Sequence, residues 1–228
     1  LGHLFSSYAT TIGFAKTYQQ MGMDKTNRIL LASAVTALIG TSVELIDGFT
    51  EYGFDYMDAI ANLLGIGIAA LELIDPKLDD AIGIRMGYMP SPRFIEKTKL
   101  NFINTVNDYS GMIYYGDINA GGMARLLGFS LPRYSDFILF GVNYGTWEYD
   151  PTGPLEEKGR RMGFHIALSL NEVFESLMEP TLWRTGLAGF FDFYAPPFTT
   201  LQRTHDYNTG CNQMGFGLNG RAMTPSCN

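Results

Sequence analysis

The sequences FILFGVNYGTWEY, residues 137–149, and MGFHIALSL, residues 162–170, decide the fold class. The first is rich in aromatic and β-branched residues, and the second has apolar side chains at every other position from Phe164 onward, which is typical of strands. Between them, residues 150–154, DPTGP, have the composition of a loop. The two runs therefore predict one long antiparallel hairpin, and a further strand is predicted at residues 82–88.

The N-terminal part of the chain has helical spacing instead. Apolar residues recur at intervals of three and four from Leu4 onward. Asp24 can cap a second helix that runs through the apolar residues 29–46 and ends at Gly48. Asp55 can begin a third helix, which should end before Pro76 because the residue before a proline avoids the helical conformation.

The order of these elements is helices, then strands, then a helix near residues 182–194, without the alternation of a nucleotide-binding sheet. We therefore expect an α+β fold. A three-helix unit, residues 1–76, should pack on an antiparallel, hairpin-rich region with a C-terminal helix, residues 77–200. The polar, glycine-rich residues 201–228 are expected to form an irregular tail that contains the cysteines.

The composition of the chain excludes several classes of protein. Hydrophobic residues make up 46% and charged residues only 17%, which excludes a disordered chain. The net charge of −7 argues against a nucleic-acid surface, which requires a basic patch. The longest charge-free apolar stretch, residues 29–43, is shorter than the roughly 20 residues of a spanning helix, so we expect helices that lie against a membrane without crossing it.

Each predicted helix carries two polar residues within an apolar sequence. The pairs are His3 with Ser7, Glu44 with Asp47, and Asp58 with Asn62. Spacings of three and four place both members of a pair on one helix face, and buried ionisable groups are costly unless paired. We therefore expect one polar cluster that locks the three helices together. A ligand or metal site, or a catalytic site built on His3, Glu44 and Asp58, remains an alternative, and the sequence itself assigns no metal and no cofactor.

Three short motifs resemble a known family. They are SVELIDGF at residues 42–49, YGFDYMD at 52–58 and ANLLG at 61–65. Their pattern is similar to that of the YfiM-like family of predicted bacterial envelope lipoproteins, and the order of the acid and the later D-x-x-x-N-x-x-G also resembles VanZ-like membrane proteins. The resemblance implies an envelope location, with a lipid anchor on a cysteine upstream of residue 1, and it implies no reaction.

We therefore expect a non-enzymatic accessory protein at the periplasmic face of the outer membrane, within a larger membrane-associated assembly. Its partners would be other envelope or outer-membrane proteins and the membrane surface, and not nucleic acid. Two alternatives remain open. One is an envelope enzyme or metal-binding protein that uses His3, Glu44, Asp47 and Asp58. The other is a lipid or small-ligand carrier with its pocket in the β region.

Cys211 and Cys227 are the two cysteines of the chain, and both lie in its last 18 residues. In an oxidising compartment this placement predicts a disulfide, which would stabilise the fold by about 3 kcal/mol in the chain-entropy model. Thiol labelling of the denatured, unreduced chain should therefore detect no free cysteine. Two labelled thiols before reduction would contradict the pairing.

Overall fold

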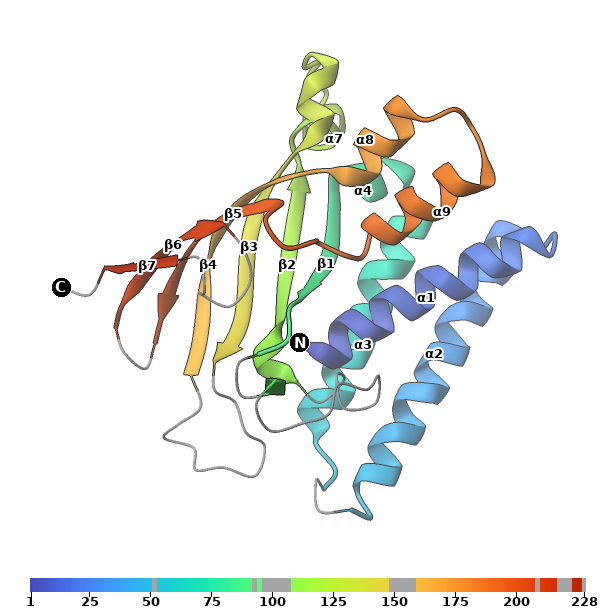
Figure 1. Ribbon diagram of the computed structural model, residues 1–228. Helices are drawn as coiled ribbons and strands as arrows, with labels where there is room; N and C mark the ends of the chain where they lie inside the picture. Colours follow the sequence, from blue (N-terminus) through green and yellow to red (C-terminus); the bar gives the residue numbers. More distant parts are fainter. Residues whose placement is uncertain are drawn as a thin grey trace. The chain divides into compact units, whose positions relative to one another are not determined.

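A computed structural model describes residues 1–50, 53–91, 94–95, 108–147, 159–207, 210–216 and 223–226. The chain folds into two compact units, Leu1–Asp80 and Ala81–Asn228. The first unit is helical, and the second is built on an antiparallel sheet (Figure 1). The predicted α+β class is therefore confirmed.

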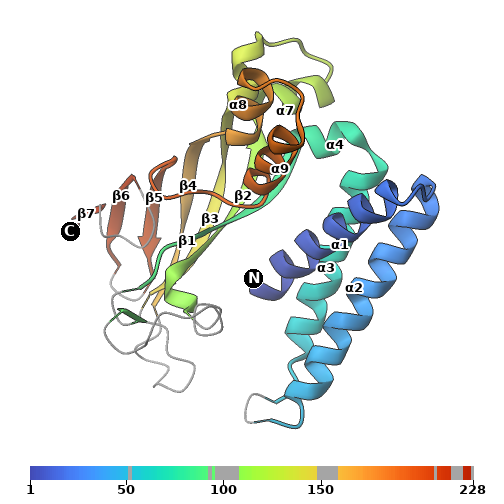
Figure 2. The same cartoon turned by 45° about the vertical axis from the view of Figure 1, so that its right-hand side comes forward.

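The helical unit contains α1 (Gly2–Gln20), α2 (Lys25–Asp47), α3 (Tyr56–Ile74) and the short α4 (Pro76–Ala81). Helices α1 to α3 lie side by side (Figure 2). The predicted caps are confirmed, since the Asp24 carboxylate accepts from the Asn27 amide and the Asp55 carboxylate accepts from the Met57 amide. Gly48 ends α2 as predicted, and it does so in a right-handed conformation (φ −58°).

Small residues occupy the contacts between these helices. They recur every fourth position, and the buried ones are Ser7, Thr11 and Ala15 on α1, Ala32, Thr36 and Gly40 on α2, and Gly65 and Ala69 on α3. At Gly65 a Cβ atom would lie 2.1 Å from the Leu4 carbonyl oxygen. The backbones of α1 and α3 are therefore in direct contact, an approach that only glycine permits.

The outer surfaces of α2 and α3 are apolar. The two helices have 23 and 19 residues, and only 22% and 28% of their most apolar windows are buried. By length and composition both could cross a membrane; a core helix of a soluble protein passes the same test, but it would be mostly buried. The expectation that the helices are too short was wrong because α2 continues through polar residues at both ends, from Lys25 to Asp47.

The second unit is a seven-stranded sheet in which every strand pairs with its neighbour in the chain (Figure 1). The strands are β1 (Ile82–Tyr88), β2 (Met112–Asn119), β3 (Ile138–Trp147), β4 (Gly159–Leu168), β5 (Thr200–Asp206), β6 (Asn212–Phe216) and β7 (Met223–Ser226). Strands β3 and β4 pair antiparallel, which confirms the predicted hairpin. The predicted loop at residues 150–154 lies outside the described residues.

Short helices connect the strands. They are η1 (Tyr109–Gly111), α7 (Ala120–Leu126), η2 (Arg133–Phe137), α8 (Leu170–Leu177) and α9 (Leu182–Phe191), the last of which confirms the predicted C-terminal helix. After α9 the chain runs along the edge of β1, where the Met86 amide donates to the Phe193 carbonyl and the Ala195 amide donates to the Met86 carbonyl. It then enters β5, the partner of β4.

The expectation of an irregular tail is wrong for the described part of residues 201–228, which forms most of β5 and all of β6 and β7. Gln202, Thr204 and Asp206 occupy the buried face of β5, and polar residues at alternate positions are ordinarily expected on an exposed face. Cys227 lies outside the described residues, so its disulfide with Cys211 stays a prediction.

Two glycines of α3 provide a matched test of the contact between α1 and α3. Gly65→Ala should lower the free energy of unfolding of the helical unit by about 1–3 kcal/mol, because the new methyl group forces the two backbones apart. Gly67→Ala meets no atom within 4 Å and should be neutral or stabilising by up to about 1 kcal/mol. Equal effects in chemical denaturation would contradict this packing.

Candidate functional site

Three helices bring a histidine and two carboxylates together at one end of the helical unit. His3 lies in the first turn of α1, Glu44 in the last turn of α2 and Asp58 in the first turn of α3. The distance from His3 Nδ1 to Glu44 Oε1 is 3.1 Å, and the distance from His3 Nε2 to Asp58 Oδ2 is 3.6 Å. The imidazole therefore lies between the two acids and faces one with each ring nitrogen.

The three side chains differ in their access to solvent. Glu44 is 2% exposed, whereas about a third of the His3 side chain and 41% of the Asp58 side chain are exposed. A buried carboxylate without a partner would be costly, so the contact with His3 stabilises the ionised form of Glu44. Since two of its three side chains reach solvent, the cluster is open to ions and protons from outside.

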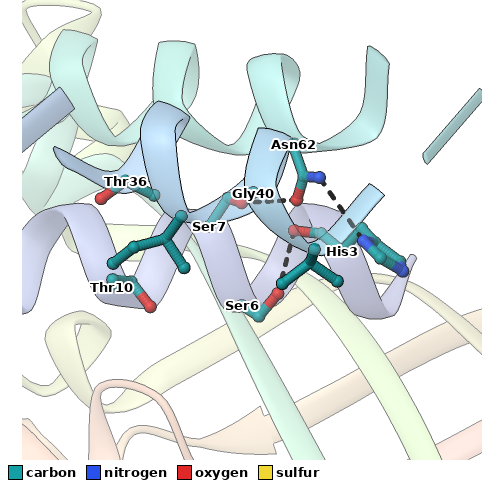
Figure 3. Close-up of a pocket in the computed structure, with 9 residues that line it drawn as sticks. His3, Ser6, Ser7, Thr10, Thr36, Gly40 and Asn62 are labelled. Atoms are coloured by element: carbon teal, nitrogen blue, oxygen red, sulfur yellow. Dashed lines mark hydrogen bonds between the residues drawn. The ribbon is translucent and has the colours of Figure 1, made fainter. Parts of the chain in front are cut away.

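Asn62 and Ser7 extend this cluster by hydrogen bonds from α3 and α1. The Ser7 hydroxyl donates to Asn62 Oδ1 at 2.7 Å, and Asn62 Nδ2 lies 3.5 Å from both His3 Nδ1 and Glu44 Oε1. Figure 3 shows Asn62 joined to Ser7 on one side and to His3 on the other. Because Ser7 holds the amide oxygen, the amide nitrogen of Asn62 is directed toward the His3–Glu44 pair.

A pocket of about 160 Å³ lies beside these residues. Its lining comes from α1, α2 and α3 and consists of His3, Ser6, Ser7, Thr10, Thr36, Ile39, Gly40, Val43 and Asn62. Thr36 is 2% exposed, and its hydroxyl has no hydrogen-bond partner among the described groups. The pocket thus extends from His3 and Asn62 to an unsatisfied hydroxyl two helical turns before Glu44 on α2.

The structure brings together five of the six residues of the expected cluster, namely His3, Ser7, Glu44, Asp58 and Asn62. Asp47 lies one turn beyond Glu44, and none of the described hydrogen bonds or ion pairs involves its carboxylate. The cluster contains no activated nucleophile among the described residues, since the Ser7 hydroxyl bonds to Asn62 and not to His3. Its groups can hold a cation or exchange protons.

A second buried cluster lies in the β unit, where the sequence analysis singled out no site. Arg85 donates to both carboxylate oxygens of Asp117, from Nε at 2.6 Å and from Nη2 at 2.9 Å. His165 Nε2 lies 2.8 Å from Asp117 Oδ1. Asp117 is on β2 and His165 on β4, and Gly141 occupies the position between them on β3. The missing side chain at Gly141 lets the two groups meet across an intervening strand.

Other polar side chains line the same face of the sheet. The buried members are Tyr115, Asn143, Arg161, Gln202, Thr204 and Asp206. Arg161 pairs with Asp206, and both amide atoms of Asn143 lack a partner among the described groups. The sequence feature that could have indicated this polar face is the polar residue at alternate positions of otherwise apolar strands. His165 could not be assigned to a site from the sequence because Asp117, the carboxylate it contacts, lies 48 residues away.

One family model is similar to the helical unit. Residues 1–74 match the family model described as predicted periplasmic lipoprotein (DUF2279). The match ends with α3 and includes every residue of the His3 cluster. No curated protein and no solved structure matches the chain. The β unit therefore has to be interpreted from its own geometry.

Removal of the buried carboxylate tests whether the cluster locks the helices together. Glu44→Ala should lower the free energy of unfolding by about 2–3 kcal/mol, because it leaves Asn62 and His3 without their buried partner. Thr41→Ala, an exposed change on the same helix, should alter it by less than about 0.5 kcal/mol. Equal stability of the two variants would show that the cluster does not hold the unit together.

Proposed function

We propose that this chain is a membrane-embedded accessory protein of the bacterial envelope, at the periplasmic face of the outer membrane and within a larger assembly. The observation that carries the proposal is the polarity of both units. Charged and amide side chains are buried beside apolar ones inside each unit, and many large apolar side chains lie at the surface, whereas a water-soluble domain seldom buries charged groups. A surface of this kind is stable in contact with hydrocarbon.

The hairpin of β3 and β4 provides the clearest case. On one face, three cross-strand pairs are apolar and lie at the surface, with side chains 41–74% exposed: Ile138 with Leu168, Phe140 with Ile166, and Val142 with Phe164. On the other face, Asn143, Arg161 and His165 are buried. Apolar residues outward and polar residues inward are the pattern of strands that face lipid. Both strands have 10 residues, the length that such strands need.

The helical unit has the same organisation. Its interior contains Glu44, Asn62 and Glu72, all less than 9% exposed. Its outside carries large apolar side chains from α2 and α3, among them Leu30, Leu38, Ile46, Leu63 and Leu71, which are 56–68% exposed. Small residues at every fourth position of the helix contacts are also characteristic of packing within membranes, where close backbone approach replaces the hydrophobic effect.

The family match and the motifs support the envelope location. A family described as predicted periplasmic lipoproteins covers the helical unit, and the resemblance to YfiM-like and VanZ-like proteins rests on residues of that same unit. The accessory role is favoured over catalysis because Ser7 is not bonded to the imidazole of His3.

Charges introduced on the apolar face of β4 test the proposal. The full chain should float with phospholipid vesicles in a density gradient, and Phe164→Glu/Ile166→Glu should lower the vesicle-bound fraction at least about tenfold. Each of these side chains would lose about 1.5–3 kcal/mol of apolar burial in lipid, and 1.4 kcal/mol corresponds to a factor of ten.

Phe129→Glu is the matched control. Phe129 is 66% exposed but lies after α7 and outside the β3–β4 face, so its substitution should leave flotation unchanged. Circular dichroism checks that both variants keep their strands. If the wild-type chain remains monodisperse in buffer without detergent and does not float, the proposal that it contacts a bilayer is wrong. If it floats only with another envelope protein present, that protein provides the apolar contact.

A further inference from the structure

We infer that His3, Glu44 and Asp58 bind one divalent transition-metal ion of the zinc class at the solvent-exposed end of the helical unit. This inference goes beyond the accessory role proposed above and does not depend on membrane contact. It rests on the geometry of the three side chains, on the charge around them and on the types of their donor atoms.

The geometry suits a metal ion after a small adjustment. One nitrogen of His3 and one oxygen each from Glu44 and Asp58 all lie within 4.8 Å of one another. Donors on a tetrahedral zinc ion at about 2.0–2.2 Å are about 3.3–3.6 Å apart, so the set has to contract by about an ångström. His3 and Asp58 are partly exposed and free to make this movement, while Glu44 is held in the interior.

The charge around the site favours a divalent cation. His3 can carry one positive charge at most, whereas Glu44, Asp47, Asp55 and Asp58 all lie at this end of the unit. The lysines and arginines of the unit, namely Lys16, Lys25, Arg28 and Lys77, lie at the opposite helix ends. A buried carboxylate among further acids is unfavourable without a counter-charge. A bound divalent ion supplies that charge.

The donor types indicate the class of metal. Imidazole is a ligand of Zn²⁺ and other transition metals, while Mg²⁺ and Ca²⁺ prefer all-oxygen sites. One histidine with two carboxylates is also a ligand set that leaves room for a further ligand, as in zinc sites with three protein ligands. The set therefore favours Zn²⁺ over the alkaline-earth ions.

The pocket beside His3 contains a buried hydroxyl that has no hydrogen-bond partner among the described groups. Thr11 and Thr17 both donate their hydroxyls to the carbonyl four residues earlier, which is the usual arrangement in a helix. Thr36 makes no such bond, although it is buried and lines the pocket together with His3 and Asn62. Thr36 lies two helical turns before Glu44 on α2, about 12 Å along the helix axis, so its hydroxyl is a position for a water in the pocket and is not part of the metal site.

Asn62 acts as a positioning residue for this site. Its amide oxygen is fixed by the Ser7 hydroxyl, and its amide nitrogen lies 3.5 Å from the Glu44 carboxylate. Metal ligands are commonly held in place by such hydrogen bonds from a surrounding shell, and loss of one lowers metal affinity about 10- to 100-fold.

The test is titration of the purified, metal-free full chain with Zn²⁺, read by calorimetry and by competition with a chromophoric chelator. We expect one equivalent to bind, with Mg²⁺ unable to displace it. Asp58→Asn and His3→Gln should each weaken Zn²⁺ binding at least about tenfold. Co²⁺ should give visible absorption bands with the wild-type chain that are absent from both variants.

Two control variants separate this site from adventitious binding. Asp79→Asn changes an exposed acid at the other end of the same unit, and His205→Gln changes a histidine of the β unit; both should leave Zn²⁺ affinity unchanged. Circular dichroism checks folding, and the partly exposed Asp58 decides the outcome if His3→Gln unfolds the chain. Equal Zn²⁺ affinity of the wild type and Asp58→Asn, or no binding at micromolar Zn²⁺, would overturn the inference.

Discussion

The requirement that buried charged groups find partners governs both units of this protein. In the helical unit, Glu44 is almost fully buried and reaches His3 and Asn62 from the other two helices. In the β unit, Asp117 is satisfied by Arg85 from β1 and His165 from β4. Each acid is thus the point at which separate elements are held in one arrangement, because an unpaired charge in either interior would cost several kcal/mol.

These contacts depend on residues without side chains. Gly65 allows α3 to touch the backbone of α1. Asn62 lies one turn before Gly65 on α3 and is thereby within hydrogen-bond distance of Ser7 on α1. Gly141 leaves the gap on β3 through which Asp117 and His165 meet. In both units the polar contact and the close backbone approach belong together, since a Cβ atom at either glycine would collide with a backbone carbonyl.

The interior of each unit contains charged and amide side chains beside apolar ones, and many large apolar side chains lie at the surface. These apolar side chains lie on the exposed faces of α2, α3, β3 and β4, and they are the surfaces that would contact lipid in the proposed environment. The His3 cluster lies at the end of its helices, where charged groups are still accessible to solvent. A site for a hydrophilic ion and a surface for lipid can therefore coexist in one unit.

The sequence by itself determined the local elements and the members of one cluster. Helix caps at Asp24 and Asp55 and the alternation around Phe164 depend on neighbours in the chain, and spacing along the helices was enough to expect His3, Glu44 and Asn62 together. The tertiary structure alone decided which face of each element is buried. The polar strand β5 and the Asp117–His165 contact were missed because their partners lie far away in the sequence, so no local pattern indicated that these polar faces are buried.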